Sequence, residues 1–399
     1  MSEANKNNNM MSSILDLIID NTLNLMSLSV AKEKRKYDWN YLFKQIGLID
    51  DKLKSVTYYD YKKEKYYNNY IFRISSAITI KDFESKIDNI GYFLNVDIND
   101  LRLEQVGNKV NLRVRNNVPM NFEYEPTKIK EFKVPLGIDI KTNKVIYHDL
   151  ISPSNCHMLL GGSTGSGKSY LLKLILCNLI YSKGKRDLQL VLINTKYTDL
   201  KVFKDCKQVI SYCEGTKDTL DILEEQVEEI EKRYKLISKH NCEDIKEYRE
   251  KVAYIPYRFI ILEEFSSYCK TNEGKTNNKF YRLVEEIVAR GRACGVLLIT
   301  TMQLSSSELV PPHIKNNINT TLGGKCKDKH KSITLCGDEG LEKLEGKGKF
   351  KLYDSKTDGV EFQSYKVEKD ILKEIVEQNK RAVKVAPSTT LTDNKNIGE

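Results

Sequence analysis

The sequence has few of the patterns that metal clusters and disulfide frameworks need. Its five histidines, at positions 148, 157, 240, 313 and 330, are isolated from one another. Its nine cysteines are scattered, and none belongs to a Cys-x-x-Cys pair. This spacing predicts neither a zinc site nor a redox motif. Because no signal peptide is recognisable either, we expect reduced thiols and a cytoplasmic protein.

Long apolar runs are also missing. The best candidate for a membrane span, residues 10–30, is interrupted by two aspartates and two asparagines, which hydrocarbon tolerates poorly. We therefore predict no transmembrane segment. The apolar residues in this stretch recur at helical spacing, which predicts an amphipathic helix. Such a helix packs on its own protein or, as the alternative, docks on a membrane surface or a partner.

The chain does have length and positive charge. Its 399 residues are enough for two or three domains with a large core. It is 40% hydrophobic and 30% charged, as is ordinary for a globular protein. Its 64 lysines and arginines exceed its 55 acidic residues, which gives a net charge of +9. This balance favours a polyanionic partner, although lysine-rich chains without one also exist.

One glycine-rich stretch predicts a phosphate-binding P-loop, Gly-x-x-x-x-Gly-Lys-Ser. An apolar run, Met158 to Leu160, precedes it and predicts a buried strand, and leucines at helical spacing follow it. Glycines let the backbone approach a phosphate, and the helix N-terminus attracts the anion. We predict that ATP is bound by Gly162, Ser163, Thr164, Gly165, Ser166, Gly167, Lys168 and Ser169. Lys168 would reach the β- and γ-phosphates, and Ser169 would offer its hydroxyl to Mg²⁺.

A second apolar run, Arg258 to Phe265, delivers two carboxylates to the end of a predicted strand. Ligands bind at this edge of an open α/β sheet. We predict that Glu263 holds the Mg²⁺ shell, where an Asp is usual, and that Glu264 polarises the attacking water. The alternative is that the two acids only cap the next helix.

The stretch Ala289 to Gln303 ends in a buried strand followed by polar groups. Thr301 and Gln303 stand where they could sense the γ-phosphate. Arg290 and Arg292 are candidates for an arginine finger that acts across a subunit interface. A surface ion pair is the alternative for each arginine.

Strands that alternate with helices predict an α/β fold with a mostly parallel sheet covered on both faces. We predict an N-terminal helical region over 1–66, a small α+β domain over 67–134, a P-loop domain over 135–366, and a C-terminal helix with a disordered tail over 367–399. The expected strands of the P-loop domain are 157–161, 189–194, 258–262, 295–301 and 318–324, and the expected helices are 216–239 and 371–383.

The small domain carries three local patterns. Residues 70–74 predict a strand, and Thr79 with Asp82 predicts a capping box. Alternation on both sides of Gly107-Asn108 predicts a hairpin. Tyrosines between residues 58 and 70 interleave with lysines, a composition that can bind single-stranded nucleic acid but that surface packing also explains. The basic patch at 32–36 is open to the same two explanations.

Together these segments resemble the motor domain of the FtsK/SpoIIIE family of DNA translocases. Beyond the P-loop and the acidic strand, the similar segments are Ile193-Asn-Thr-Lys196, Glu231-Lys-Arg-Tyr-Lys-Leu236, Arg290-Gly-Arg-Ala-Cys-Gly295, Thr300-Thr-Met-Gln303, Ile314-Lys-Asn-Asn-Ile318 and Leu341-Glu-Lys-Leu-Glu-Gly-Lys-Gly348. The resemblance covers residues 135–366 and implies that they form a RecA-like P-loop NTPase motor. It also implies a homo-hexameric ring that hydrolyses ATP with Mg²⁺ and moves along double-stranded DNA without reading its sequence. Lys325, Lys327, Lys329 and Lys331 become candidate phosphate contacts.

The departures from the family narrow the expected role. We expect no winged-helix domain like the family's after residue 366, and no membrane anchor. The architecture looks more like the FtsK-like coupling proteins of mobile elements and conjugative plasmids. We therefore expect DNA transfer or segregation, a relaxase or membrane-channel partner, and recruitment to the membrane by that partner. The alternatives are a HerA-like packaging or resection motor, and a nucleotide-gated adaptor with weak hydrolysis.

Overall fold

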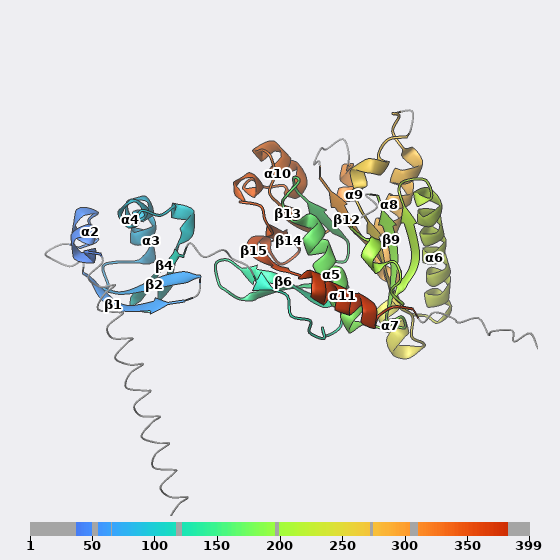
Figure 1. Cartoon of the computed structure of the whole chain (residues 1–399), viewed down its shortest axis with the longest axis horizontal. Coiled ribbons are helices and arrows are strands. Elements are labelled where there is room, and N and C mark those ends of the chain that lie inside the picture. The colour runs from blue at the N-terminus through green and yellow to red at the C-terminus, as the bar shows by residue number, and fades with distance from the viewer. Residues whose placement is uncertain are drawn as a thin grey trace, which may run out of the picture. The chain divides into compact units, whose positions relative to one another are not determined.

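A computed structural model describes residues 37–49, 55–64, 66–116, 122–195, 199–271, 274–303 and 310–381. The chain divides into two compact units, residues 1–120 and 121–399, which are described separately (Figure 1). The predicted amphipathic helix at 10–30, the basic patch at 32–36 and the C-terminal tail lie outside the described residues. No helix among the described residues is both long and apolar enough to span a bilayer.

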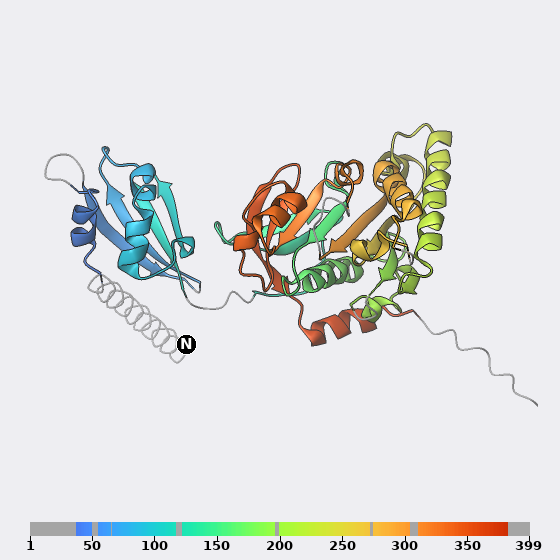
Figure 2. The same ribbon diagram turned by 90° about the horizontal axis from the view of Figure 1, so that it is seen from above.

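The described part of the first unit holds a four-stranded antiparallel sheet in the order β1-β2-β4-β3. Alternate residues of each strand point to one face, where Phe72 and Leu112 join Trp39, Phe43 and Phe83 in a single core. The helices contribute to that core and therefore cover this face (Figure 2). The elements are α2 (Trp39–Gln45), β1 (Val56–Lys63), β2 (Tyr67–Ile74), α3 (Ile80–Glu84), α4 (Ile87–Leu94), η1 (Ile98–Asp100), β3 (Leu101–Val106) and β4 (Lys109–Arg115).

Two predictions for the first unit are wrong: where its sheet begins, and the single helix after Thr79. Residues 56–63 were expected in a helical region, but they form β1, because tyrosines on a strand pack well against the aromatic core. The small sheet therefore begins before residue 67. The predicted helix after Thr79 is two helices, α3 and α4, although Asp82 accepts the predicted bond from the Thr79 amide at 2.8 Å. The hairpin at Gly107-Asn108 is confirmed.

Among the described residues, the second unit is built on one sheet of eleven strands. Six neighbouring strands pair in parallel, in the order β10, β9, β11, β12, β8 and β13. The strands beyond β13 pair mostly in antiparallel. Across the sheet the order is β10 (Val209–Glu214), β9 (Leu188–Asn194), β11 (Tyr257–Leu262), β12 (Val296–Met302), β8 (Met158–Gly161), β13 (Thr320–Gly324), β14 (Lys349–Tyr353), β15 (Asp358–Lys366), β6 (Lys133–Asp139) and β7 (Val145–Asp149), and β5 (Phe122–Glu123) pairs with β15.

Helices cover this sheet, so its central strands are continuous buried apolar runs. The P-loop helix α5 packs on β6, β8 and β15, and α11 packs on α5. Helix α8 packs on β12, and α6 packs on α8 (Figure 1). The helices are α5 (Lys168–Ser182), η2 (Lys201–Phe203), α6 (Thr219–Lys239), α7 (Ile245–Lys251), η3 (Phe265–Tyr268), α8 (Asn278–Cys294), α9 (Pro312–Lys315), α10 (Lys329–Cys336), η4 (Leu341–Lys343) and α11 (Lys369–Gln378).

The predicted α/β fold with a mostly parallel core is confirmed, and each of the five predicted motor strands lies within two residues of an observed one. Strand β10 and the antiparallel strands β6, β7, β14 and β15 were not predicted. The C-terminal helix ends at Gln378 rather than at residue 383, and it packs on α5 as part of the second unit.

Candidate functional site

The P-loop leaves the carboxyl end of β8 and enters α5 through three glycines with positive φ. The φ angles are 145° at Gly162, 81° at Gly165 and 105° at Gly167, a region that other residues rarely adopt. At Gly167 a Cβ atom would lie 2.9 Å from the amide nitrogen of Gly348. The loop therefore needs glycine for its backbone angles and, at Gly167, for space.

Two neighbouring segments hold the P-loop from the side of β13 and β14. The Ser163 amide donates to the Lys325 carbonyl at 2.7 Å, and the Gly348 amide donates to the Ser166 carbonyl at 3.0 Å. Lys325, which was predicted to contact DNA phosphates, thus bonds the nucleotide loop through its main-chain carbonyl. Lys329, further along, pairs with Glu339 at 2.8 Å.

The Lys168 side chain folds over the loop that it follows. Its Nζ donates to the Gly162 carbonyl at 2.5 Å and to the Ser163 carbonyl at 3.1 Å, and the residue is 7% exposed. An ammonium group held above main-chain amides suits phosphate oxygens, which can replace the carbonyl acceptors. The geometry fits the nucleotide that the motif predicts.

Asp199, which the sequence motifs did not single out, lies against the predicted metal ligand Ser169. The Ser169 hydroxyl donates to Asp199 Oδ2 at 2.5 Å, and Lys173 Nζ lies 3.0 Å from Oδ1. Burial opposes ionisation of Asp199, but hydrogen bonds from Ser169 and Lys173, the Lys173 charge and a hydrogen bond with Glu263 outweigh it and lower its pKa. Asp199 follows β9, so the rule that ligands bind at carboxyl ends of strands could have found it.

The acidic strand β11 ends at this same place. Glu263 is 2% exposed and Glu264 is 6% exposed. The Thr195 hydroxyl, after β9, donates to the Glu263 carbonyl at 2.6 Å and so joins the ends of the two strands. Ser169, Asp199 and Glu263 together offer hydroxyl and carboxylate oxygens, the ligands that Mg²⁺ prefers. The residues therefore fit the predicted metal.

Glu264 is held in a strained backbone conformation. Its φ is 56° and its ψ is 72°, which costs a non-glycine residue about 1 kcal/mol. Its amide donates to Thr301 Oγ1 at 2.9 Å, and its Oε1 accepts from the Gln303 amide at 3.1 Å and from the Ser266 hydroxyl. Because β12 lies between β8 and β11, Gln303 and Glu264 meet beside the P-loop.

The structure does not place Arg290 and Arg292 with these residues. Both lie near the end of α8, before β12 begins, and therefore at the amino edge of the parallel strands. Arg290 pairs with Glu231, and its guanidinium lies 5.3 Å from the centre of the Tyr234 ring. Arg292 donates to the Pro153 carbonyl at 3.3 Å. Neither arginine can act on the P-loop of its own subunit.

Comparisons with known proteins concern mainly the second unit, which holds this site. Residues 121–311 match the model of the FtsK/SpoIIIE family. DNA translocase FtsK of Borreliella burgdorferi is 28% identical over 228 residues, which are 55% of this chain and 28% of that protein. DNA translocase SftA of Bacillus subtilis is 27% identical over 273 residues, 64% of this chain and 28% of that protein. The chain thus spans less than a third of the length of these relatives.

Two solved structures share the fold. The pCW3 conjugation coupling protein TcpA, in a monomer form with ATPgS, is 21% identical, has a TM-score of 0.58, and matches 85% of this chain and 98% of its own. ATPases 2 and 3 of EssC from Geobacillus thermodenitrificans are 15% identical, with a TM-score of 0.58 over 66% of this chain and 51% of theirs. The predicted resemblance is confirmed: residues 121–311 match the FtsK/SpoIIIE family model, and the second unit has the fold of a P-loop ATPase.

Proposed function

We propose that this chain hydrolyses ATP to move double-stranded DNA. One observation carries the proposal: Glu264 is held beside the P-loop by Thr301 and the Gln303 amide, in a domain that matches a family whose curated members are named DNA translocases. The buried Glu264 carboxylate accepts from the Gln303 amide and the Ser266 hydroxyl, while Thr301 holds the Glu264 main chain, and a carboxylate fixed in this way is suited to orient one water molecule for attack.

The nucleotide site divides its work among the residues described above. Lys168 would exchange its bonds to Gly162 and Ser163 for phosphate oxygens. Ser169, with Glu263 and Asp199 behind it, would hold Mg²⁺, which neutralises charge on the β- and γ-phosphates when bound. Gln303 follows Met302 at the end of β12 and couples the position of Glu264 to that strand.

We further propose a homo-hexameric ring in which Arg290 or Arg292 reaches the nucleotide of a neighbouring subunit. Their place at the amino edge of the sheet supports action on a neighbour. Arg290 would first have to leave Glu231. Mixed rings test this role: Arg290→Ala or Arg292→Ala subunits, combined with Glu264→Gln subunits, should lose hydrolysis only where the missing arginine faces an intact site.

The biological role that we propose is DNA transfer or segregation of a plasmid or integrative element, with a relaxase or channel protein as partner. The chain and the coupling protein TcpA share a fold over 98% of the solved TcpA chain, which supports this role over that of an isolated motor domain. Pull-down of the purified chain with a candidate relaxase and with a candidate nuclease would separate transfer from packaging or resection.

The first experiment measures steady-state ATP hydrolysis without nucleic acid, with linear duplex and with single strands, over a salt series. We expect duplex DNA to stimulate hydrolysis strongly, with a stimulation that falls steeply as salt rises. A slow rate that is the same in all three conditions would contradict the motor and favour the nucleotide-gated adaptor. In that case Glu264→Gln would leave the adaptor's function intact.

A further inference from the structure

Among the described residues of the first unit, the helices pack on one face of the sheet and leave the other face uncovered (Figure 2). Side chains of Phe72, Leu112 and Val110 point into the core under α2, α3 and α4. Their strand neighbours point the other way, because successive side chains alternate. Arg73 and Lys109 are such neighbours and stand directly opposite each other on β2 and β4. We call this second side of the sheet the open face.

The open face is basic. By the register of the four strands, the outward positions hold six cations and two acids. The cations are Lys62, Arg73, Arg102, Lys109, Arg113 and Arg115, and the acids are Asp60 and Glu104. Two further acids lie at the edge, where Glu64 pairs with Arg113 at 3.2 Å and Asp100 pairs with Arg115 at 3.3 Å. The acids therefore neutralise only part of this charge.

Like charges stand opposite each other twice on this face. Arg73 is directly across from Lys109, and Arg102 is directly across from Arg113. Such pairs destabilise a sheet by a few tenths of a kcal/mol each. Folding alone does not favour placing two of them on one small face. An anionic partner that lies over the face would reverse the sign of both contributions.

The same face arranges its cations around two tyrosine rings. Arg73 and Lys109 lie 4.9 and 3.8 Å from the centre of the Tyr59 ring, and Arg113 lies 4.5 Å from the centre of the Tyr67 ring. A cation that rests on an aromatic ring keeps its charge and loses some of its freedom. Among the described residues, no carboxylate pairs with Arg73 or Lys109. These two cations are thus fixed in place and open to an external anion.

We propose that the open face binds the sugar–phosphate backbone of double-stranded DNA. Phosphate contacts need only positioned cations and carry no sequence information. Base stacking on a single strand needs a row of accessible rings, but Tyr59 is 48% exposed and Tyr67 only 2%. The choice of DNA among polyanions rests on the proposed function of the ATPase domain. The small unit would then hold the same duplex that the motor moves.

The test uses the full chain without nucleotide and a short fluorescein-labelled duplex, with anisotropy measured over a salt series. The variant Arg73→Gln/Lys109→Gln removes the two cations around Tyr59. Its matched control, Lys81→Gln/Lys86→Gln, removes the same charge from the helical side of the same unit. We expect the open-face variant to bind on the order of tenfold more weakly and to lower the log–log salt slope by about two, while the control stays near wild type.

A second measurement needs no substitution. Bound duplex should protect Lys109 and Lys62 from acetylation, read by mass spectrometry, while Lys81 on the helical side reacts as before. This readout holds even if the double variant folds poorly, which its thermal unfolding would reveal. Equal protection of all three lysines would overturn the proposal.

The other outcomes separate this inference from the proposed function. If wild type binds the duplex and both double variants bind it equally well, the open face is not the site, and the motor proposal stands. If wild type does not bind the duplex at low salt, both proposals fall. If the open-face variant loses binding only to phosphatidylglycerol vesicles, the face recognises lipid phosphate and the DNA proposal is overturned.

Discussion

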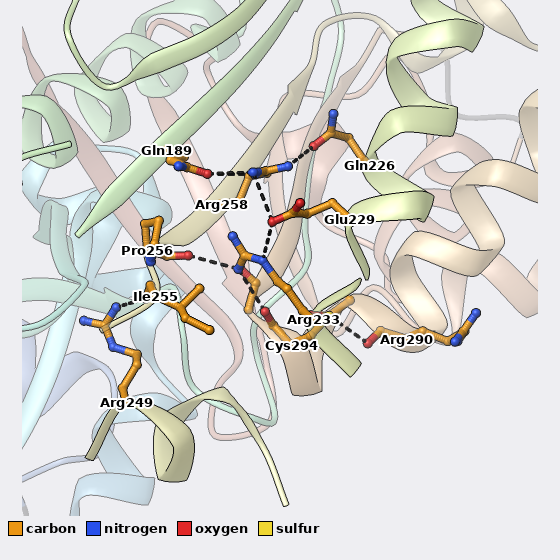
Figure 3. A network of polar contacts seen from close by, with 12 residues as sticks. Gln189, Gln226, Glu229, Arg233, Arg249, Ile255, Pro256, Arg258, Arg290 and Cys294 are labelled. Atoms are coloured by element: carbon orange, nitrogen blue, oxygen red, sulfur yellow. Dashed lines mark hydrogen bonds and ion pairs between the residues drawn. The ribbon is translucent and has the colours of Figure 1, made fainter. Parts of the chain in front are cut away.

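The parallel sheet of the second unit buries charged side chains at both of its edges. At the carboxyl ends of the strands lie the P-loop, Asp199 and the acidic pair. At the amino ends, Arg258 of β11 and Arg233 of α6 meet at Glu229 (Figure 3). Both edges contain acidic and basic side chains. At the amino edge these side chains bind one another, whereas at the carboxyl edge they surround the proposed nucleotide site.

At the amino edge, the charged groups bond one another and neighbouring protein groups. Arg233 bonds Glu229 at 2.8 Å and donates to the carbonyls of Pro256 and Cys294 at 2.9 and 3.0 Å. Arg258 donates to Gln189 and Gln226 and lies 3.1 Å from Glu229. Burial lowers the pKa of Arg258 to about 10, against the attraction of Glu229. The network ties α6 to β11 and to the end of α8.

The carboxyl edge instead relies on backbone with positive φ, which is strained at Glu264 and unstrained at the glycines. Glu264 and three P-loop glycines have positive φ, and Lys168 bonds carbonyls that a phosphate can replace. The contrast teaches that buried charge alone does not mark a functional site in this fold. Strained backbone at the point where several strands end is the better marker.

The largest effect is expected from Glu264→Gln. The amide keeps the size of the side chain but removes the carboxylate that orients water, so we expect hydrolysis to fall 10²- to 10⁴-fold. ATP binding, measured with a fluorescent analogue, should stay within about threefold of wild type, because Lys168 and the P-loop are intact.

Glu229→Gln is the matched control at the other edge. It should lower the unfolding temperature and leave the rate of hydrolysis per folded molecule unchanged. If Glu229→Gln reduced the rate as much as Glu264→Gln, the distinction between the two edges would be wrong.

Arg233→Met should give the largest loss of stability. It removes a buried guanidinium that bonds the half-buried Glu229 carboxylate and the carbonyls of Pro256 and Cys294, and breaking a buried pair costs about 3–5 kcal/mol. For a domain of this size we expect the unfolding temperature to drop by roughly 6–15 °C. Lys232→Met, whose Glu228 pair is exposed on both sides, should change it by no more than about 2 °C. Similar shifts for the two variants would show that the network adds little.

Local patterns predicted the features that depend on neighbours in the chain. The P-loop, the five buried strands and the Gly107 hairpin each follow from a few consecutive residues. Strand β1 was missed because its run of tyrosine and lysine lacks a clear apolar alternation. Its place becomes visible only when Tyr61 meets Tyr70 across the sheet.

Features that the fold assembles were harder to predict. Asp199 stands thirty positions after Ser169, beyond β9 and without a motif of its own. Arg290 and Arg292 are close in sequence to Gln303, but strand β12 separates them from it. Seven buried residues of β12 carry the chain from one edge of the sheet to the other. Proximity in sequence therefore gave no guide to proximity in the site.

Asp199→Asn tests the residue that the motifs missed. Asp199 accepts the Ser169 proton and so aims the hydroxyl lone pairs at the metal position. Losing such a support typically weakens metal binding 10- to 100-fold. We expect the Mn²⁺ dissociation constant, measured by electron paramagnetic resonance in the presence of ATP, to rise by about tenfold.

Asp205→Asn, on the exposed end of the same segment, is the control and should leave Mn²⁺ binding unchanged. If Asp199→Asn bound Mn²⁺ as tightly as wild type, Asp199 would not support the metal site, and its role would be the ion pair with Lys173. Its contribution would then be to the stability of α5 alone.

The smallest effect concerns pH, and it lies at the amino edge. Nδ1 of His157 accepts the Leu298 amide at 3.0 Å. Burial, and then the charge of Arg292, lowers its pKa from 6.5 to about 4. Because the folded pKa is the lower one, the unfolded chain binds the proton first. Stability should therefore fall as pH drops from about 6.5 to about 4, by up to about 1.4 kcal/mol per pH unit.

The variant His157→Asn keeps an acceptor near Nδ1 but cannot be protonated in this range. It should be less stable than wild type at neutral pH, and its unfolding temperature should fall less steeply between pH 6.5 and 4. Arg292→Gln removes the nearby cation, so the His157 pKa should rise and the acid-sensitive window should narrow. If the unfolding temperature fell equally steeply between pH 6.5 and 4 in all three proteins, protonation of His157 would not govern stability.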